Sequence, residues 1–184
     1  MSKQHENVEP DLAEWIARQH IFFVATAPLS NDGHVNLSPK GGDAFRLLGP
    51  MEAAYQDYTG SGAETVAHLR ENGRIVIMFC AFEGGPKIVR LHGRGAVVMP
   101  GDLRFEELAG HFPPNPGTRA LIHIAIERVS DSCGLSVPFY EFAGPRDQLD
   151  RWAEKQGSEK LAEYRANKNQ RSIDNLPAFS EAVP

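Results

Sequence analysis

A short loop with glycine and hydroxyl residues is the segment of this sequence best suited to chemistry. In YTGSGAETVAHLRENGR, residues 58–74, Gly60, Ser61 and Gly62 stand between a strand-like run and a helical pattern. Glycines let a backbone turn tightly and let a ligand approach it closely. The free amides at the start of the helix, with their partial positive charge, favour a phosphate. The loop from Gly60 to Thr65 is therefore a candidate phosphate site, with the hydroxyls of Ser61 and Thr65 as further donors.

The same residues also fit an ordinary helix start. Ser61 and Glu64 have the S-x-x-E spacing of a capping box, which makes Ser61 the expected N-cap and Asn72-Gly73 the expected end of the helix. A carboxylate at Glu64 repels a phosphate unless it folds back to cap the backbone. The sequence contains neither a Walker motif nor a complete dinucleotide fingerprint. A phosphate loop and a capped helix without a ligand both remain open on the sequence alone.

Other residue types that carry catalysis occur without a recognisable pattern. The seven histidines show no HxxH or HExxH spacing, and Cys80 and Cys133 form no CxxC pair. No Gly-x-Ser-x-Gly elbow is present either. We therefore expect no metal site, no disulfide and no hydrolase chemistry, and no catalytic side chain can be named.

Composition and charge narrow the class of protein. The 184 residues are 41% hydrophobic and 23% charged, which suits one domain with a well-buried core. The formal net charge of -5 lacks the basic excess that binding to duplex nucleic acid usually needs. The chain has no apolar run of about 18 residues, and its N-terminus, MSKQHENVEPD, is polar. We expect a cytoplasmic protein with neither a nucleic-acid nor a membrane partner.

Short apolar runs predict strands that meet through tight turns. The turn signals are Asn31-Asp32-Gly33, Gly49-Pro50 and residues 83–86, and Pro39, Gly41 and Gly42 are expected to break the second strand. Strands are predicted at 21–27, 34–38, 45–48, 51–58, 74–82, 87–98 and 120–129. Helices are predicted at 11–19, after the loop at 60–63, and at 103–109, 146–156 and 158–167.

Hairpin-connected strands with few helices predict an α+β protein that is mainly β, an antiparallel barrel or sandwich with helical decoration. We expect a single domain over residues 1–184, with a barrel core at 11–130 and C-terminal helices and a tail at 146–184. The tail sequence KNQRSIDNLPAF mixes polar and apolar residues and is unlike a disordered segment. We therefore predict that it folds against the barrel near a cofactor site.

The order of these motifs resembles the pyridoxamine 5'-phosphate oxidase-like, FMN-binding split-barrel family. The stretches GHVNLSPKGG, YTGSGAETVAHLRENGRIVIMF and GPKIVRLHGRGAVV carry the resemblance, which covers about residues 11 to 130. The resemblance implies a six-stranded antiparallel Greek-key split barrel of the FMN-binding type. It also implies a homodimer with the cofactor at the subunit interface and a small-molecule substrate that the sequence does not identify.

The resemblance further implies which residues hold the cofactor. In the oxidase an arginine and a lysine at the start of the loop helix hold the phosphate, and Glu64 and Thr65 stand at those positions here. Val35 and Asn36 stand near the arginine that begins the second-strand motif. These differences argue against pyridoxamine phosphate oxidation more than against FMN binding, because divergent members of the family hold the flavin with other polar groups. The expected cofactor-binding residues are Ser38, Lys40, Tyr58, Thr59, Gly60, Ser61, Gly62, Thr65 and Lys87.

Three functions are consistent with these residues. The first is a flavin-dependent oxidoreductase in which FMN carries hydride or electrons and the protein supplies position and electrostatics. The second is a non-catalytic flavin or haem binding or storage protein, because some split-barrel relatives bind haem and a single axial ligand, for which His92 is the candidate, suffices. The third is a barrel that has lost its cofactor, and Glu64 is the main argument for it.

Overall fold

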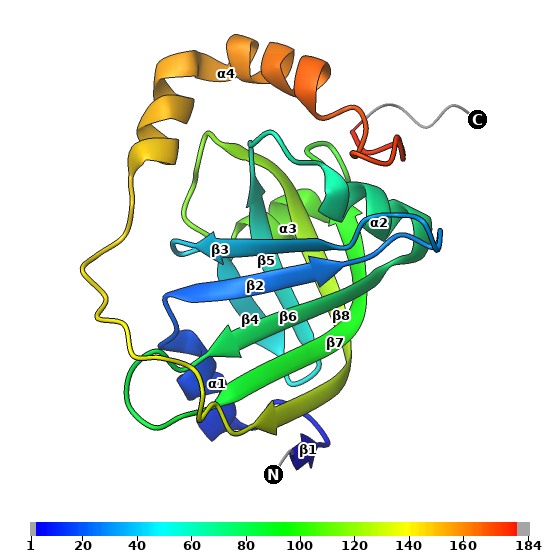
Figure 1. The fold of residues 1–184 in the computed structure, drawn as a ribbon. Helices are drawn as coiled ribbons and strands as arrows, with labels where there is room; N and C mark the ends of the chain where they lie inside the picture. The colour runs from blue at the N-terminus through cyan, green and yellow to red at the C-terminus, as the bar shows by residue number, and fades with distance from the viewer. Residues whose placement is uncertain (1–2, 180–184) are drawn as a thin grey trace.

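One antiparallel sheet forms the body of the protein in the computed structural model, which describes residues 3–179. Its eight strands follow the order β3-β2-β6-β7-β8-β5-β4, and β1 pairs with the end of β8 (Figure 1). The strands are β1 (Lys3–His5), β2 (Ile21–Thr26), β3 (Asn36–Gly41), β4 (Phe45–Gly49), β5 (Glu52–Tyr58), β6 (Arg74–Cys80), β7 (Ile88–Val98) and β8 (Thr118–Ser132). The mainly antiparallel α+β class expected from the sequence is thus confirmed.

The number of strands differs from the expected six. Eight strands form within the described residues, and β1 lies outside the expected barrel core. The three residues of β1 are too few to show a hydrophobic period, so the local sequence could not predict this strand. β8 also extends to Ser132, beyond the predicted end at residue 129, because Lys3–His5 and β7 both pair with this end of the strand.

The predicted hairpin of β2 and β3 is confirmed, but the predicted break at Pro39 is wrong. β3 continues through Pro39 to Gly41, and Pro39 lies opposite Phe23 of β2. Proline has no N–H to donate to a neighbouring strand, so it is tolerated in a sheet mainly on an edge strand. β3 stands at one end of the sheet order and therefore has such a free edge.

Four helices decorate the sheet within the described residues: α1 (Pro10–Ala17), α2 (Glu64–Asn72), α3 (Phe105–Ala109) and α4 (Gln148–Lys168). All four lie where the sequence predicted helices, with boundaries shifted by a few residues. α2 ends at Gly73, whose φ of 72° is the left-handed conformation that glycine adopts without steric cost. Gly157 has φ 72° and ψ 170° and kinks α4 between the two predicted helices.

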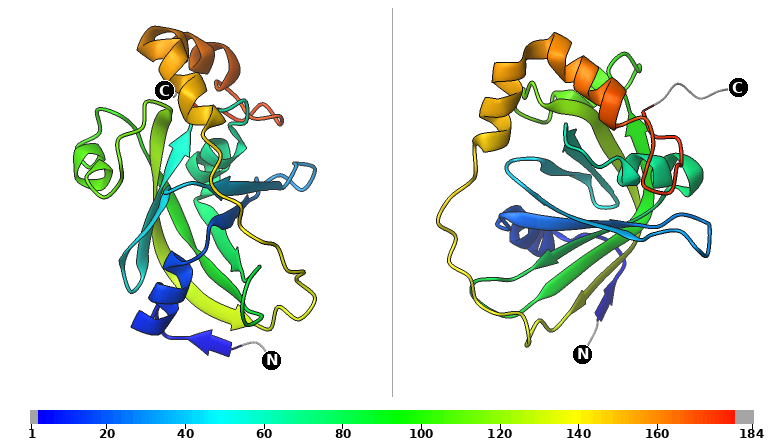
Figure 2. Two further views of the ribbon diagram at one scale, coloured as in Figure 1. Left: turned by 90° about the vertical axis from the view of Figure 1, so that its left-hand side faces the viewer. Right: turned by 45° about the horizontal axis from the view of Figure 1, so that its top comes forward.

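The sheet curls into a half-barrel around the main hydrophobic core (Figure 2). Side chains alternate along β2, so that Phe22 and Val24 are buried while Phe23 is half-buried. A bulge at Glu127 of β8, opposite His92 and Gly93 of β7, helps β8 to curve against β7. Gly93 is required there, because a Cβ atom at this position would lie 2.1 Å from the carbonyl oxygen of Ala125. A smaller cluster lies between the sheet and α3, and its buried members are Ala54, Val98, Leu108, Phe112 and Leu121.

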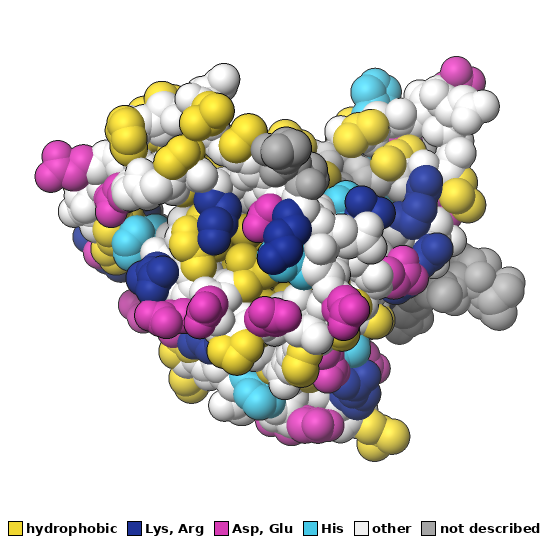
Figure 3. Space-filling model, turned by 90° about the horizontal axis from the view of Figure 1, so that it is seen from below, with side chains coloured by type: hydrophobic (Ala, Val, Ile, Leu, Met, Phe, Trp, Pro, Cys, Tyr) yellow, Lys and Arg dark blue, Asp and Glu magenta, His cyan; other side chains and the backbone are white. Residues whose placement is uncertain are grey.

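The half-barrel is open between its two end strands, β3 and β4. After β8 the chain runs in an extended segment along one side, and α4 then crosses the top of the sheet, so that the residues after it lie beside α2 (Figures 1 and 2). Acidic and basic side chains are interspersed on the lower face (Figure 3). Within residues 3–179, no helix combines the length and the apolar character needed to cross a membrane.

Candidate functional site

A cleft of about 290 Å³ lies at the open side of the half-barrel, between β3, the end of β5 and the start of α2. The open edge of β3 forms one wall, and the loop between β5 and α2 forms another. The lining residues are Asn36, Ser38, Pro39, Lys40, Tyr58, Gly60, Gly62, Glu64, Thr65 and Arg119.

Six of the nine expected cofactor-binding residues line this cleft: Ser38, Lys40, Tyr58, Gly60, Gly62 and Thr65. Thr59 is fully buried behind the loop, where its hydroxyl donates to the carbonyl of Gly117 at 2.8 Å. Ser61 is exposed at the tip of the loop. Lys87 lies outside the cleft, with its ammonium 5.4 Å from the ring centre of Trp15.

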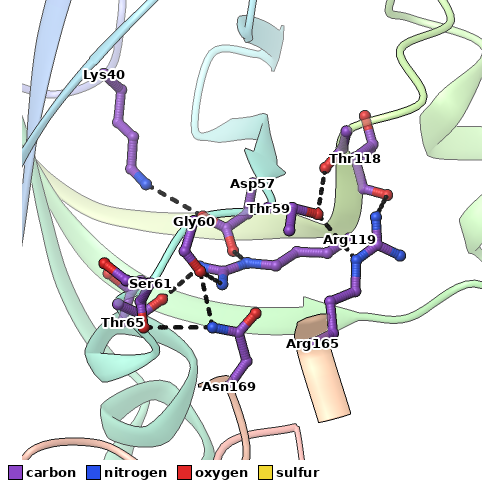
Figure 4. A network of polar contacts seen from close by, with 12 residues as sticks. Lys40, Asp57, Thr59, Gly60, Ser61, Thr65, Thr118, Arg119, Arg165 and Asn169 are labelled. Atoms are coloured by element: carbon purple, nitrogen blue, oxygen red, sulfur yellow. Dashed lines mark hydrogen bonds and ion pairs between the residues drawn. The ribbon is translucent and has the colours of Figure 1, made fainter. Parts of the chain in front are cut away.

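A buried ion cluster connects the two walls of the cleft (Figure 4). The carboxylate of Asp57 is fully buried and accepts from Arg119 Nε at 2.7 Å and from Lys40 Nζ at 3.1 Å. Burial raises the pKa of the Asp57 carboxyl, but the charges of Lys40 and Arg119 outweigh it, so the pKa lies below its ordinary value of 3.8. Asp57 is therefore ionised, and it draws the side chain of Lys40 across the gap in the sheet.

Arg119 also holds the loop between β5 and α2. Its two terminal nitrogens donate to the carbonyls of Gly60 at 3.1 Å and Gly62 at 2.8 Å, while the ring of Phe179 lies 4.8 Å from the guanidinium carbon. A trans peptide unit holds its C=O and N–H in opposite directions. The N–H groups of Ser61 and Ala63 therefore point away from Arg119.

The C-terminal segment braces the same loop from outside, and this agrees with the prediction that the tail folds against the barrel. Asn169 is fully buried and its amide nitrogen donates to the carbonyl of Gly60 at 2.8 Å. Arg165 Nε donates to the Thr59 hydroxyl at 2.9 Å (Figure 4). Further along, Ala178 is completely buried in the main core. The tail is thus part of the folded body up to the last described residues.

The predicted capping box is wrong. α2 begins at Glu64 rather than after Ser61, its N-cap residue is Ala63, and no side chain caps it. The carboxylate of Glu64 instead accepts from the backbone N–H of Ile173 in the tail, at 3.3 Å. The contacts of Arg119 and Asn169 with the loop carbonyls keep residues 60–62 out of the helix, so tertiary contacts override the local motif.

The donors of the cleft suit an anionic group. Lys40 keeps N–H groups beyond its bond to Asp57, and its side chain is 22% exposed. A Cβ atom at Gly60 would meet nothing within 4 Å, so there is free space beside the loop. Glu64 opposes an anion, because its carboxylate lines the same cleft. The residues present therefore fit a phosphate that is held chiefly by Lys40, Thr65 and loop amides.

No acid or base in the cleft stands free among the described residues. Tyr58 donates to the side-chain oxygen of Gln56 at 2.9 Å, and burial, together with the carboxylates of Asp150 and Asp43, raises its pKa to about 12. Lys40, Glu64 and Arg119 each have the partners described above. Each ionisable side chain that lines the cleft therefore has a partner within the protein.

Sequence reasoning missed Asp57, Arg119 and Arg165, and it predicted Asn169 to lie near a cofactor site only as one of the polar residues of the tail. A charged residue inside the apolar strand run AAYQDY is a signal of a buried ion pair, and it was available in the sequence. Its partner Arg119 is 62 residues away, and Asn169 is 109 residues from Gly60. Nothing in the local sequence indicates contacts over such distances.

The histidines do not gather around the cleft. Among residues 3–179, no group of three or more His, Cys, Asp or Glu side chains is arranged to hold a metal ion. His92, the candidate haem ligand, lies on β7 and is not among the residues that line the cleft.

Comparison with known proteins agrees with this architecture. A family model for pyridoxamine 5'-phosphate oxidase matches residues 8–133. The pyridoxamine 5'-phosphate oxidase family protein ustO of Aspergillus flavus is 37% identical over an alignment of 196 positions, which covers 97% of this chain and 78% of that protein.

Solved structures share the fold at lower identity. HupZ of Group A Streptococcus superposes with a TM-score of 0.52 and 23% identity, over 66% of this chain and 90% of that chain. An FAD-binding protein from Mesorhizobium loti superposes with a TM-score of 0.50 and 15% identity, over 71% and 96% of the two chains. The half-barrel is the split barrel that the resemblance implied. The chain belongs to the pyridoxamine 5'-phosphate oxidase family.

Proposed function

We propose that this protein is a cytoplasmic, homodimeric flavoprotein that binds FMN in the cleft between β3 and α2 and acts as a flavin-dependent oxidoreductase. The observation that carries the proposal is Lys40, whose ammonium contacts the buried Asp57 and lines the same cleft as Thr65 and the start of α2, where helix amides favour a phosphate. The FAD-binding protein from Mesorhizobium loti, which has the same fold, supports a flavin as the ligand.

The size of the cleft supports a site shared between two subunits. Pockets that enclose a whole ligand measure roughly 300–1,000 Å³, and this cleft of about 290 Å³ falls just below that range. One subunit has room for the phosphate and its neighbouring atoms, and a second subunit would cover the flavin ring. The exposed apolar residues Leu37, on the edge strand β3, and Val35, just before this strand, suit such a contact.

The residues of the cleft have distinct roles in this proposal. Lys40 supplies a full positive charge, Thr65 a hydroxyl donor and the loop a set of backbone N–H groups for the phosphate. Arg119 and Asn169 hold the loop in the required shape through its carbonyls. When bound, the flavin supplies hydride or electron transfer, and the protein supplies position and electrostatics.

A flavin holder without turnover is the second candidate. It is favoured by the pairing of the ionisable groups in the cleft, which leaves no side chain ready to act as an acid or base on a substrate. An oxidoreductase remains our first choice, because electron and hydride transfer at a flavin require no protein acid or base at the same atom.

The absorption spectrum of untagged protein after gel filtration tests the proposal. We expect a yellow protein that releases FMN on denaturation and elutes as a dimer. Anaerobic bleaching by NADH or NADPH supports an oxidoreductase, whereas a bound flavin that neither donor bleaches favours a holder. A colourless protein that also fails to take up added FMN overturns the flavin assignment.

A further inference from the structure

We propose that Asn36 determines the specificity of the cleft for a phosphate-bearing flavin, because it sets the direction of the hydrogen bonds in the wall formed by Ser38 and Thr65. The inference rests on the proposed function and deepens it. Asn36 does not need to touch the phosphate for this role; it acts as a positioning residue through its neighbours.

Asn36 stands at the centre of a chain of hydrogen bonds. Its amide nitrogen donates to the hydroxyls of Thr65 at 3.0 Å and Thr26 at 3.2 Å, and its amide oxygen accepts from the Ser38 hydroxyl at 3.0 Å. The Thr26 hydroxyl also contacts Nδ1 of His68 at 3.0 Å. His68 is fully buried, so this chain runs from the cleft wall into the interior.

The direction of this chain decides what the cleft offers to a ligand. A hydroxyl has one hydrogen to donate. The Ser38 hydroxyl donates its hydrogen to Asn36, so it can only accept hydrogen bonds from a ligand in the cleft. Thr65 accepts from Asn36, so its own hydrogen points away from Asn36, toward the cleft or toward the neighbouring Tyr55 hydroxyl. The wall can thus offer a donor at Thr65 and an acceptor at Ser38, in the cleft that Lys40 also lines.

Such a wall matches a phosphorylated ligand. Phosphate oxygens accept hydrogen bonds and carry negative charge, which suits Thr65 and Lys40 together. An acceptor at Ser38 suits a ligand hydroxyl, of the kind found on the sugar-alcohol chain next to the phosphate of FMN. If Asn36 were turned over, Thr65 would donate inward to Asn36, and the phosphate would lose one of its donors.

The decisive variant is Asn36→Asp, which has nearly the same shape. A carboxylate still accepts from Ser38, but it cannot donate to Thr65, so Thr65 turns its hydrogen inward. The variant also adds a negative charge. The matched control is Asn31→Asp, which makes the same chemical change at an exposed position of the turn before β3, without touching the chain of hydrogen bonds.

The experiment measures FMN and riboflavin affinities of the apo forms by titration. We expect Asn36→Asp to lower the affinity for FMN relative to riboflavin by about tenfold more than Asn31→Asp does, which is the scale of one hydrogen bond to a charged group. In a Thr65→Val background, Asn36→Asp should change this ratio no more than Asn31→Asp. A ratio that is the same for Asn36→Asp and Asn31→Asp in the wild-type background overturns the proposal.

If the wild-type protein binds neither FMN nor riboflavin, the proposed function fails and the specificity role of Asn36 fails with it. If it binds FMN and the ratio is unchanged in Asn36→Asp, only the role of Asn36 fails.

Discussion

Replacement of Lys40 by alanine tests the electrostatics of the cleft most directly. The side chain reaches from β3 to the buried carboxylate of Asp57 on β5, with 3.1 Å between the charged atoms. The change therefore removes a positive charge from the proposed phosphate site and one of the two cations that neutralise Asp57. Two separate effects follow, one on FMN binding and one on folding stability.

The binding effect follows from the strength of hydrogen bonds to charged groups. Such a bond contributes about 1.5–3 kcal/mol, which corresponds to a change of about 10- to 150-fold in the dissociation constant. Lys40 divides its N–H groups between Asp57 and a ligand, and its side chain is 22% exposed. We therefore expect the lower part of that range, about 10- to 30-fold weaker FMN binding.

The stability effect is limited by the second partner of Asp57. Breaking a buried ion pair costs about 3–5 kcal/mol when the remaining charge has no other partner. Here Arg119 keeps its contact with the Asp57 carboxylate at 2.7 Å. We expect Lys40→Ala to lower the free energy of unfolding by about 1–2 kcal/mol, which leaves the protein folded.

Titration of FMN and riboflavin into the apo forms, with urea unfolding in parallel, separates these effects. Riboflavin lacks the phosphate, so its affinity should hardly change in Lys40→Ala. Thr65→Val should weaken FMN less than Lys40→Ala, because it removes a neutral donor. Lys87→Ala is the matched control, since this lysine lies outside the cleft against Trp15. Equal losses for the two ligands in Lys40→Ala would refute the electrostatic argument, and unchanged FMN affinity would place the phosphate elsewhere.

Three further substitutions test the loop and the sheet. Arg119→Leu should lower the free energy of unfolding in urea by about 3–5 kcal/mol, because it leaves a buried carboxylate with one cation and frees two loop carbonyls. The control Arg94→Gln, at an exposed pair with Glu127, should change this free energy by less than about 1 kcal/mol. Similar losses of stability in the two variants would contradict this account. Glu64→Gln should tighten FMN binding, measured by titration, by several-fold because it removes a carboxylate from the cleft; weaker binding would mean that the contact of Glu64 with the tail matters more. Gly93→Ala should leave little folded protein by circular dichroism, since its Cβ would overlap a carbonyl of β8, whereas Gly85→Ala has open space and should fold normally.

Features set by neighbouring residues were predictable from the sequence. Gly73 ends α2 because glycine adopts a positive φ freely, and the turn at residues 31–33 joins β2 to β3 as its composition indicates. The order of strands and helices followed from hydrophobic period and turn residues for the same reason. Local patterns failed where the environment decides: Pro39 is allowed in β3 only because that strand lies on an edge.

The site was predictable in part. The motifs identified six residues that the structure brings to one cleft, because the strand and loop that carry them are short, continuous segments. The sequence could not show that Asp57 orients Lys40, that Arg119 turns the loop carbonyls, or that Asn169 braces the loop. Each of these contacts joins residues distant in the chain, so they form only when β3, β5, β8 and the tail pack together.

By itself the sequence determined the class of fold, the order of its elements and the loop that faces the cleft, because these depend on interactions within a few residues. Only the tertiary structure decided the chemistry of the site. The N-cap of α2 is Ala63 and not the predicted Ser61, since buried contacts from Arg119 and Asn169 hold the loop carbonyls more strongly than a local cap would. The charge that faces the cleft likewise depends on how Lys40, Asp57 and Arg119 are buried together, which no local pattern specifies.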